Sequence, residues 1–161
     1  MTVNEYNKSV DLYSDRLYRF ILKNISDLHK AEDIVQDCYE KLWKNFQNVS
    51  YEKVKAYLFT SAYHTLIDNL RKDKRSAFTE ETALKEISYE NHYSDLKEIL
   101  NDAVNRLPDI QRMVLLLRDY EGYSYKEIGE LTSLTESQVK VYIYRARLFL
   151  KNYIGKIEVL I

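Results

Sequence analysis

The chain has 161 residues, of which 45% are hydrophobic and 30% are charged, and its formal net charge is −1 at pH 7. Only 3 glycines and 1 proline are present, and because turns and strands need these residues more than helices do, the composition favours an all-α fold. The single cysteine excludes an internal disulfide and a cysteine-rich zinc site, and no apolar run approaches the roughly 18 residues of a membrane span, so we expect a soluble cytoplasmic protein without direct membrane insertion.

Apolar residues with helical spacing fill most of the first half of the chain, recurring at intervals of three and four residues. The segments concerned are 11–25, 31–46 and 54–75. Three such helices can bury a core of their own, so we predict a first domain over 1–76. On the second helix we expect Trp43 and Cys38 to belong to this core, the cysteine as a small buried hydrophobe.

An acidic stretch follows the first domain. Residues 77–96 carry five acidic residues and one base, and their helical periodicity is weak. We therefore predict a linker at 77–94, with a short helix at about 83–87.

The second domain, predicted over 95–161, opens with two helices. The first is expected to run from Leu96 to Leu107. The second starts at Pro108, because the missing N–H of proline would have no partner in a first helical turn anyway. A turn at 121–122 ends this helix.

Two capping boxes then follow in close succession. One consists of Ser124 and Glu127, and the other of Thr135 and Gln138. In this pattern an N-cap hydroxyl and the side chain three residues later exchange hydrogen bonds with the backbone, which starts a helix. The helices are predicted to begin at Tyr125 and Glu136. A connection of only three to four residues between two capped helices is the sequence form of a helix-turn-helix.

The second of these helices divides into an apolar face and a polar face. Its outer face and flanks present the candidate DNA-contacting residues Ser137, Gln138, Lys140, Val141, Tyr144, Arg145 and Arg147. Near the start of the helix, polar side chains can address base edges and Val141 can touch a thymine methyl, whereas the arginines suit phosphates. The alternative is a solvated basic helix, and a helix-turn-helix alone does not name a function.

Two blocks of sequence carry a more specific resemblance. "AEDIVQDCYEKLW" (31–43), followed by "KAYLFTSAYHTLIDNLRKDKR" (55–75), resembles the core domain of bacterial sigma factors. The segment 100–150 is similar to their C-terminal promoter-binding domain. Both blocks in this order resemble the extracytoplasmic-function (ECF) class, which implies an all-α protein of two small helical domains that directs promoter-specific initiation by RNA polymerase.

The resemblance also implies a protein-binding surface. Four polar residues on the 31–46 helix share the side opposite the core: Asp33, Gln36, Asp37 and Glu40. Such a stripe is commonly a solvated face. In the family, the matching positions bind the beta-prime coiled coil of core RNA polymerase, and the beta flap is a further expected contact.

By the same resemblance, the helix at 54–75 and the loop before it would recognise and melt the minus-ten promoter element. The residues expected there are Asn48, Ser50, Tyr51, Phe59, Tyr63, His64, Arg71, Lys72, Lys74 and Arg75. Bases lose their stacking partners when DNA melts, and aromatic rings such as Phe59 and Tyr63 can stack on them instead. The alternative for both residues is a position in the core. His64 is a base contact or a neutral surface histidine. The family often has an Arg-Asn pair where this chain has Tyr63 and His64, which implies a different promoter preference.

Other classes of function fit less of the chain. No phosphate loop, metal-ligand spacing or paired carboxylates indicate an enzyme, a metal site or a cofactor. One alternative is a stand-alone helix-turn-helix regulator, which would not explain the acidic stripe or the aromatic helix. Another is an interaction module that has lost DNA binding, against which the retained bases Lys140, Arg145 and Arg147 argue. The family resemblance further implies control by an anti-sigma factor.

Overall fold

The computed structural model describes residues 1–77 and 96–160, with side chains described except at 75–77 and 157–160. All regular elements within these residues are helical, which confirms the predicted all-α class. The predicted linker, with its short helix at about 83–87, lies outside the described residues.

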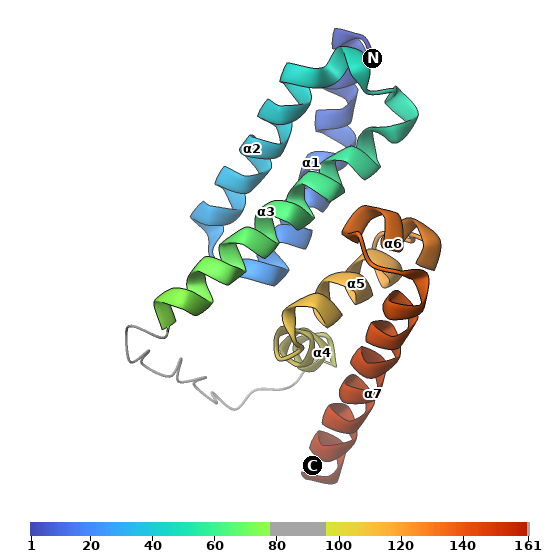
Figure 1. Ribbon diagram of the computed structural model, residues 1–161. Coiled ribbons are helices and arrows are strands. Elements are labelled where there is room, and N and C mark those ends of the chain that lie inside the picture. The colour runs from blue at the N-terminus through green and yellow to red at the C-terminus, as the bar shows by residue number, and fades with distance from the viewer. Residues whose placement is uncertain (78–95, 161) are drawn as a thin grey trace.

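The first three α-helices form a bundle (Figure 1). They are α1 (Val3–Ile25), α2 (Leu28–Asn45) and α3 (Val54–Ala77). Two short 3₁₀ turns, η1 (Phe46–Asn48) and η2 (Tyr51–Lys53), connect α2 to α3. Leucines and isoleucines at helical spacing, such as Leu17, Ile21 and Leu58, are fully buried between the three helices, as the periodicity predicts.

Trp43 was predicted to be a core residue, and this is wrong. Its side chain is 48% exposed. Tyr39, four residues earlier, is buried instead, and its hydroxyl donates to the Ser9 carbonyl at 2.9 Å. The apolar face of α2 is therefore turned toward Tyr39, and the Trp43 ring stacks on Phe46 at the rim of the bundle, with 5.1 Å between centroids. Cys38 is buried as predicted.

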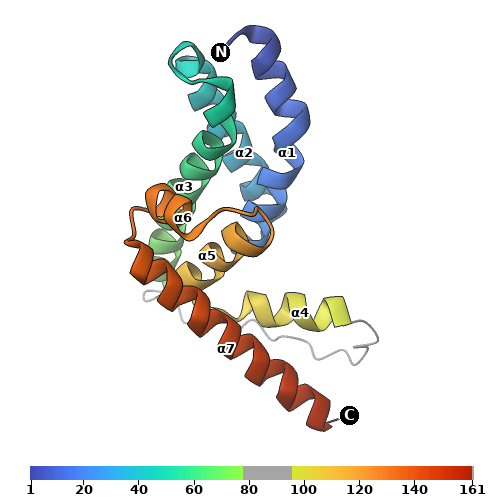
Figure 2. The ribbon, with the colours of Figure 1, turned by 90° about the vertical axis from the view of Figure 1, so that its right-hand side faces the viewer.

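Four helices make up the second half of the chain. They are α4 (Leu96–Asn105), α5 (Asp109–Asp119), α6 (Tyr125–Thr132) and α7 (Glu136–Leu160). The helix α5 is central, because its residues from Arg112 to Leu117 are all buried. Figure 2 shows α7 lying across α5 and α4. The helix α4 ends two residues before Leu107, and Pro108 occupies the N-cap position of α5.

The helix-turn-helix has both predicted capping boxes. Ser124 caps α6, and the Thr135 hydroxyl accepts from the Gln138 backbone at 3.1 Å while the Gln138 side chain accepts from the Thr135 backbone at 2.9 Å. Between the helices, Ser133 adopts a left-handed conformation (φ 60°). The turn passes close over Gly129, whose carbonyl accepts from the Leu134 N–H at 3.1 Å.

The two sets of helices pack against each other in the structure. α1 contacts α5, and α3 contacts α6 (Figures 1 and 2). Buried residues from both sets form one continuous cluster, in which the ring of Phe59 lies 5.4 Å from that of Phe20 and 6.2 Å from that of Tyr123. We call this packing of α5 and α6 onto α1 and α3 the closed arrangement.

Replacing Gly129 by alanine tests the tight turn. A Cβ there would lie 2.9 Å from the Leu134 carbonyl oxygen, whereas a Cβ at Gly155, also within a helix, would meet nothing within 4 Å. We expect Gly129→Ala to lower the free energy of unfolding by about 1 kcal/mol or more, because overpacking outweighs helix propensity. Gly155→Ala should instead raise it by up to about 1 kcal/mol. Urea unfolding of both variants measures the difference, and stabilisation by both would contradict the close approach.

Candidate DNA-binding and protein-binding surfaces

The outer face of α7 brings the predicted promoter-reading residues together. The exposed members are Ser137, Gln138, Lys140, Val141, Tyr144, Arg145 and Arg147. On the opposite face Val139, Ile143 and Ala146 are buried and fix the helix against the rest of the second half. The start of α7 is therefore packed on its apolar face and exposed to solvent on its polar face, which is the geometry of a helix that can enter a major groove.

Hydrogen bonds and ion pairs restrict what three of these side chains can do. The Gln138 side-chain carbonyl is occupied by the Thr135 N–H at 2.9 Å, so its amide N–H groups are what it can offer to a base. Lys140 lies 3.5 Å from Glu136 on the same helix. Arg147 donates to Asp119 at 2.8 Å, and this hydrogen bond raises the pKa of the guanidinium. A phosphate would have to replace Asp119 as the partner of Arg147.

The predicted polymerase-binding stripe lies on the exposed side of α2. Asp33, Gln36, Asp37 and Glu40 are all exposed. Glu40 pairs with Lys44 at 3.0 Å, whereas the other three make no hydrogen bond or ion pair with any described residue. The exposed Trp43 lies three residues after Glu40, beside the stripe, so an aromatic ring borders the acidic side chains. Its exposure was missed because its spacing also fits the apolar face.

The loop before α3 presents part of the minus-ten set. Asn48 and Ser50 are exposed and Tyr51 is half-buried. Asn48 and Ser50 line a cleft whose opposite wall is formed by α6, including Glu127 and Glu130. The two acids thus face the loop that was predicted to contact the minus-ten element.

On α3 the structure separates the basic residues from the aromatic ones. Arg71, Lys72 and Lys74 are exposed, as is His64, while the side chain of Arg75 lies outside the described residues. Lys74 also lies 3.3 Å from Asp109 of α5.

Phe59 and Tyr63 do not present their rings to solvent in the closed arrangement. Phe59 is 0% exposed and Tyr63 is 6% exposed, so both are core residues here. Burial also raises the pKa of Tyr63. The physical reason is that Phe59 packs edge-on against Phe20 of α1 on one side and Tyr123 on the other, while α6 lies against α3. Spacing along α3 alone could not reveal that another helix covers this side.

Among residues 1–77 and 96–160, Cys38 and the potential metal ligands form no second site. Burial raises the pKa of the Cys38 thiol to about 12, so it stays protonated and unreactive near neutral pH. The part of the chain that the structure describes has no group of three or more potential metal ligands. Among the same residues, no helix is both long and apolar enough to span a membrane.

Comparison with known proteins finds the same two-part organisation. Residues 10–76 match the family model described as Sigma-70 region 2, and residues 97–150 match that of Sigma-70, region 4. The ECF RNA polymerase sigma factor SigM of Bacillus subtilis (strain 168) is 29% identical over 157 residues, with 94% of each chain covered. The sigma factor SigV of the same strain is 30% identical over 132 residues, which cover 80% of this chain and 78% of SigV.

A solved structure shares both the fold and its arrangement. It is that of the sigma factor RpoE from Bartonella quintana in complex with the anti-sigma factor NepR. The match has a TM-score of 0.77 at 25% identity and covers 95% of this chain and 98% of RpoE.

Proposed function

The chain belongs to the sigma-70 family of RNA polymerase sigma factors, within its ECF group, and we propose how its halves divide the work of directing transcription initiation. Residues 1–76 bind core polymerase and recognise and melt the minus-ten element, and residues 95–161 recognise the minus-thirty-five element. The observation that carries this proposal is the pairing of an exposed acidic stripe on α2 with an exposed polar face on α7. A stand-alone regulator would need only the second.

The stripe on α2 anchors the polymerase. Asp33, Gln36 and Asp37 have no competing partner among the described residues, so a basic partner can take them without first breaking an ion pair. Glu40 must first leave Lys44. We add Trp43 to the anchor, because a half-exposed indole beside charged residues is typical of the residues that dominate protein interfaces.

The helix α7 chooses the promoter. Gln138 donates its amide N–H groups to base edges while its carbonyl holds the capping box, so this residue links helix formation to base reading. Arg145 and Arg147 hold phosphates, which orient the helix without reading sequence. Most of the affinity for DNA then comes through the polymerase, which suits a chain of net charge −1.

Promoter melting falls to α3 and the loop before it. Asn48, Ser50 and Tyr51 line a base pocket, and the basic end of α3 holds the backbone. Phe59 and Tyr63 are buried in the closed arrangement, so they do not offer rings to unstacked bases there. We infer that the protein acts in the cytoplasm, where polymerase and chromosome meet, with no catalytic step or cofactor of its own. An anti-sigma factor would control it, as the RpoE–NepR complex suggests.

Charge reversal on α2 tests the polymerase anchor. We expect Asp33→Lys combined with Asp37→Lys to weaken binding of the full chain to core polymerase at least tenfold, because a charge repelled by a basic partner replaces one attracted to it. Competition pull-down against the wild-type chain measures the change. Glu98→Lys, at an exposed site on α4, is the matched control and should bind normally. Equal binding by the double variant would show that the stripe is only a solvated face.

Two substitutions on α7 separate base reading from phosphate binding. With holoenzyme on promoter fragments, Gln138→Ala should reduce discrimination between promoters by a factor that corresponds to about 1–3 kcal/mol. Arg147→Ala should instead weaken binding to all sequences and lower the salt dependence of log K by about 1. Arg145→Ala is the companion variant, since Arg145 forms no ion pair with any residue that the structure describes, and it should behave like Arg147→Ala. Loss of discrimination in the arginine variants alone would reverse the assignment.

A further inference from the structure

We propose that a basic hollow between α1, α4 and the end of α5, together with an uncharged hollow beside it, binds a nucleoside polyphosphate. The phosphates lie at the charged end and the nucleoside at the uncharged end. Such binding goes beyond the proposed function, because neither hollow contains a residue that we assign to polymerase or promoter DNA.

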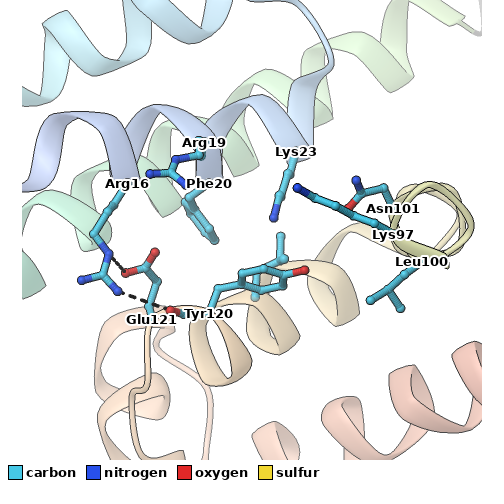
Figure 3. A pocket seen from close by; sticks show the side chains of 10 residues that line it. Arg16, Arg19, Phe20, Lys23, Lys97, Leu100, Asn101, Tyr120 and Glu121 are labelled. Carbon is cyan, nitrogen blue, oxygen red and sulfur yellow. Dashed lines mark hydrogen bonds and ion pairs between the residues drawn. The ribbon is translucent and has the colours of Figure 1, made fainter. Parts of the chain in front are cut away.

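Basic side chains from two helices line the first hollow. Arg16, Arg19 and Lys23 recur at intervals of three and four residues, so they share one face of α1. Lys97, near the start of α4, lines the same hollow. Figure 3 shows the Lys23 and Lys97 side chains extending from the two helices into the same space, beside the Tyr120 ring. Four positive charges thus surround a hollow of about 360 Å³.

The acids around this hollow compensate only part of its charge. Glu121 is the only acid among the described residues that line it, and the Glu121 carboxylate already lies 3.3 Å from Arg16 and 3.2 Å from Lys55 (Figure 3). Arg19 pairs with Asp15 on the exposed side of α1, and an exposed pair of this kind is weak enough for a phosphate to replace the carboxylate. The first hollow therefore keeps a positive balance.

Lys23 shows the cost of that balance most directly. It makes no ion pair with any residue that the structure describes, and its ammonium group lies instead over the Tyr120 ring, 3.7 Å from the centroid. Burial, together with the positive charges of Arg19 and Lys97, lowers the pKa of Lys23. A bound anion would offset both the repulsion and the lost hydration of this ammonium group.

The second hollow adjoins the first and differs from it in chemistry. The two share Lys23, Asn101 and Tyr120. The other residues that line the second hollow, of about 300 Å³, are uncharged: Leu22, Ser26, Leu28, Val104 and Asn105. Asn101 and Asn105 lie one turn apart on α4, and their amides can donate to and accept from a base edge or a sugar hydroxyl. Leu28 is 59% exposed and offers apolar surface.

The two hollows together fit one class of small molecule. Their volumes lie in the range of small-molecule sites, which combine apolar surface with a few polar groups. Arginine and lysine at the first hollow suit phosphate, and the amides at the second suit a nucleoside. A polyphosphate also concentrates several negative charges on adjacent groups, as a small hollow requires, whereas DNA spaces its phosphates along an extended strand.

Calorimetric titration of the free, full-length chain tests this site. Without divalent cations, we expect at least one of the common ribonucleoside triphosphates to bind. Inorganic triphosphate should bind at least about tenfold more weakly, because it leaves the second hollow empty. Adenosine and guanosine, which lack phosphates, should not bind detectably. Failure of every nucleotide to bind would overturn the inference, and equally tight binding of inorganic triphosphate would overturn its assignment of the nucleoside.

Substitutions at the two ends separate their roles. We expect Lys23→Gln and Lys97→Gln each to weaken binding of both the nucleotide and inorganic triphosphate at least about fivefold, because each removes a charge that holds phosphate. Asn105→Ala should weaken binding of the nucleotide and leave that of inorganic triphosphate unchanged. Lys8→Gln is the matched control, since Lys8 is an exposed lysine of α1 outside both hollows, and it should bind like the wild type.

The exposed polar face of α7 is the other place where a nucleotide would meet cations, and Arg145→Ala distinguishes the two. This variant should keep the nucleotide affinity of the wild type, because Arg145 lies in neither hollow. Nucleotide binding that is lost in Arg145→Ala and retained in Lys23→Gln and Lys97→Gln would place the ligand on the DNA-reading face and overturn the inference.

Discussion

The buried guanidinium of Arg112 is the contact on which the arrangement of the helices depends. Arg112 is 5% exposed, and its nitrogens donate to the Asn24 side chain at 2.8 Å, the Asn24 carbonyl at 3.4 Å, the Leu107 carbonyl at 3.0 Å and Asp109 at 2.8 Å. A buried cation without these partners would be strongly unfavourable. The hydrogen bonds of Arg112 therefore fix the end of α1, the turn after α4 and the first turn of α5 relative to one another.

Once α1 and α5 are fixed relative to each other, the turns after α5 and α6 decide where α6 and α7 lie. The end of α5 is brought against α1 and α3, where Glu121 meets its two cations. Gly122 (φ 73°) then turns the chain so that Ser124 can start α6 against α3. The three-residue turn after α6 sends α7 back across α5 and α4. The polar face of α7, for which we propose promoter reading, remains exposed, whereas Phe59 and Tyr63 on α3 are buried.

The local parts of this structure could be predicted from the sequence, whereas its long-range contacts could not. Capping boxes such as that of Thr135 and Gln138 are encoded within four residues, and both helices of the helix-turn-helix start where the pattern places them. Spacing on α2 likewise predicts an exposed Asp33 and Asp37, but it misplaces Trp43, which shares the spacing of the apolar face and yet is 48% exposed, with its ring stacked on Phe46. Phe59 packs against Phe20 of α1 and against Tyr123, which lies 64 residues further along, and no periodicity within α3 carries the information that these two rings meet it.

The central claim is that this chain directs polymerase to particular promoters, and run-off transcription on a genomic promoter pool tests it most directly. Core RNA polymerase is supplied with and without the chain, and the 5′ ends of the transcripts are sequenced. We expect new transcripts that appear only with the chain and share two upstream motifs at a fixed spacing, one for each half of the protein. Transcripts identical with and without the chain, despite normal binding to core polymerase, would contradict the account.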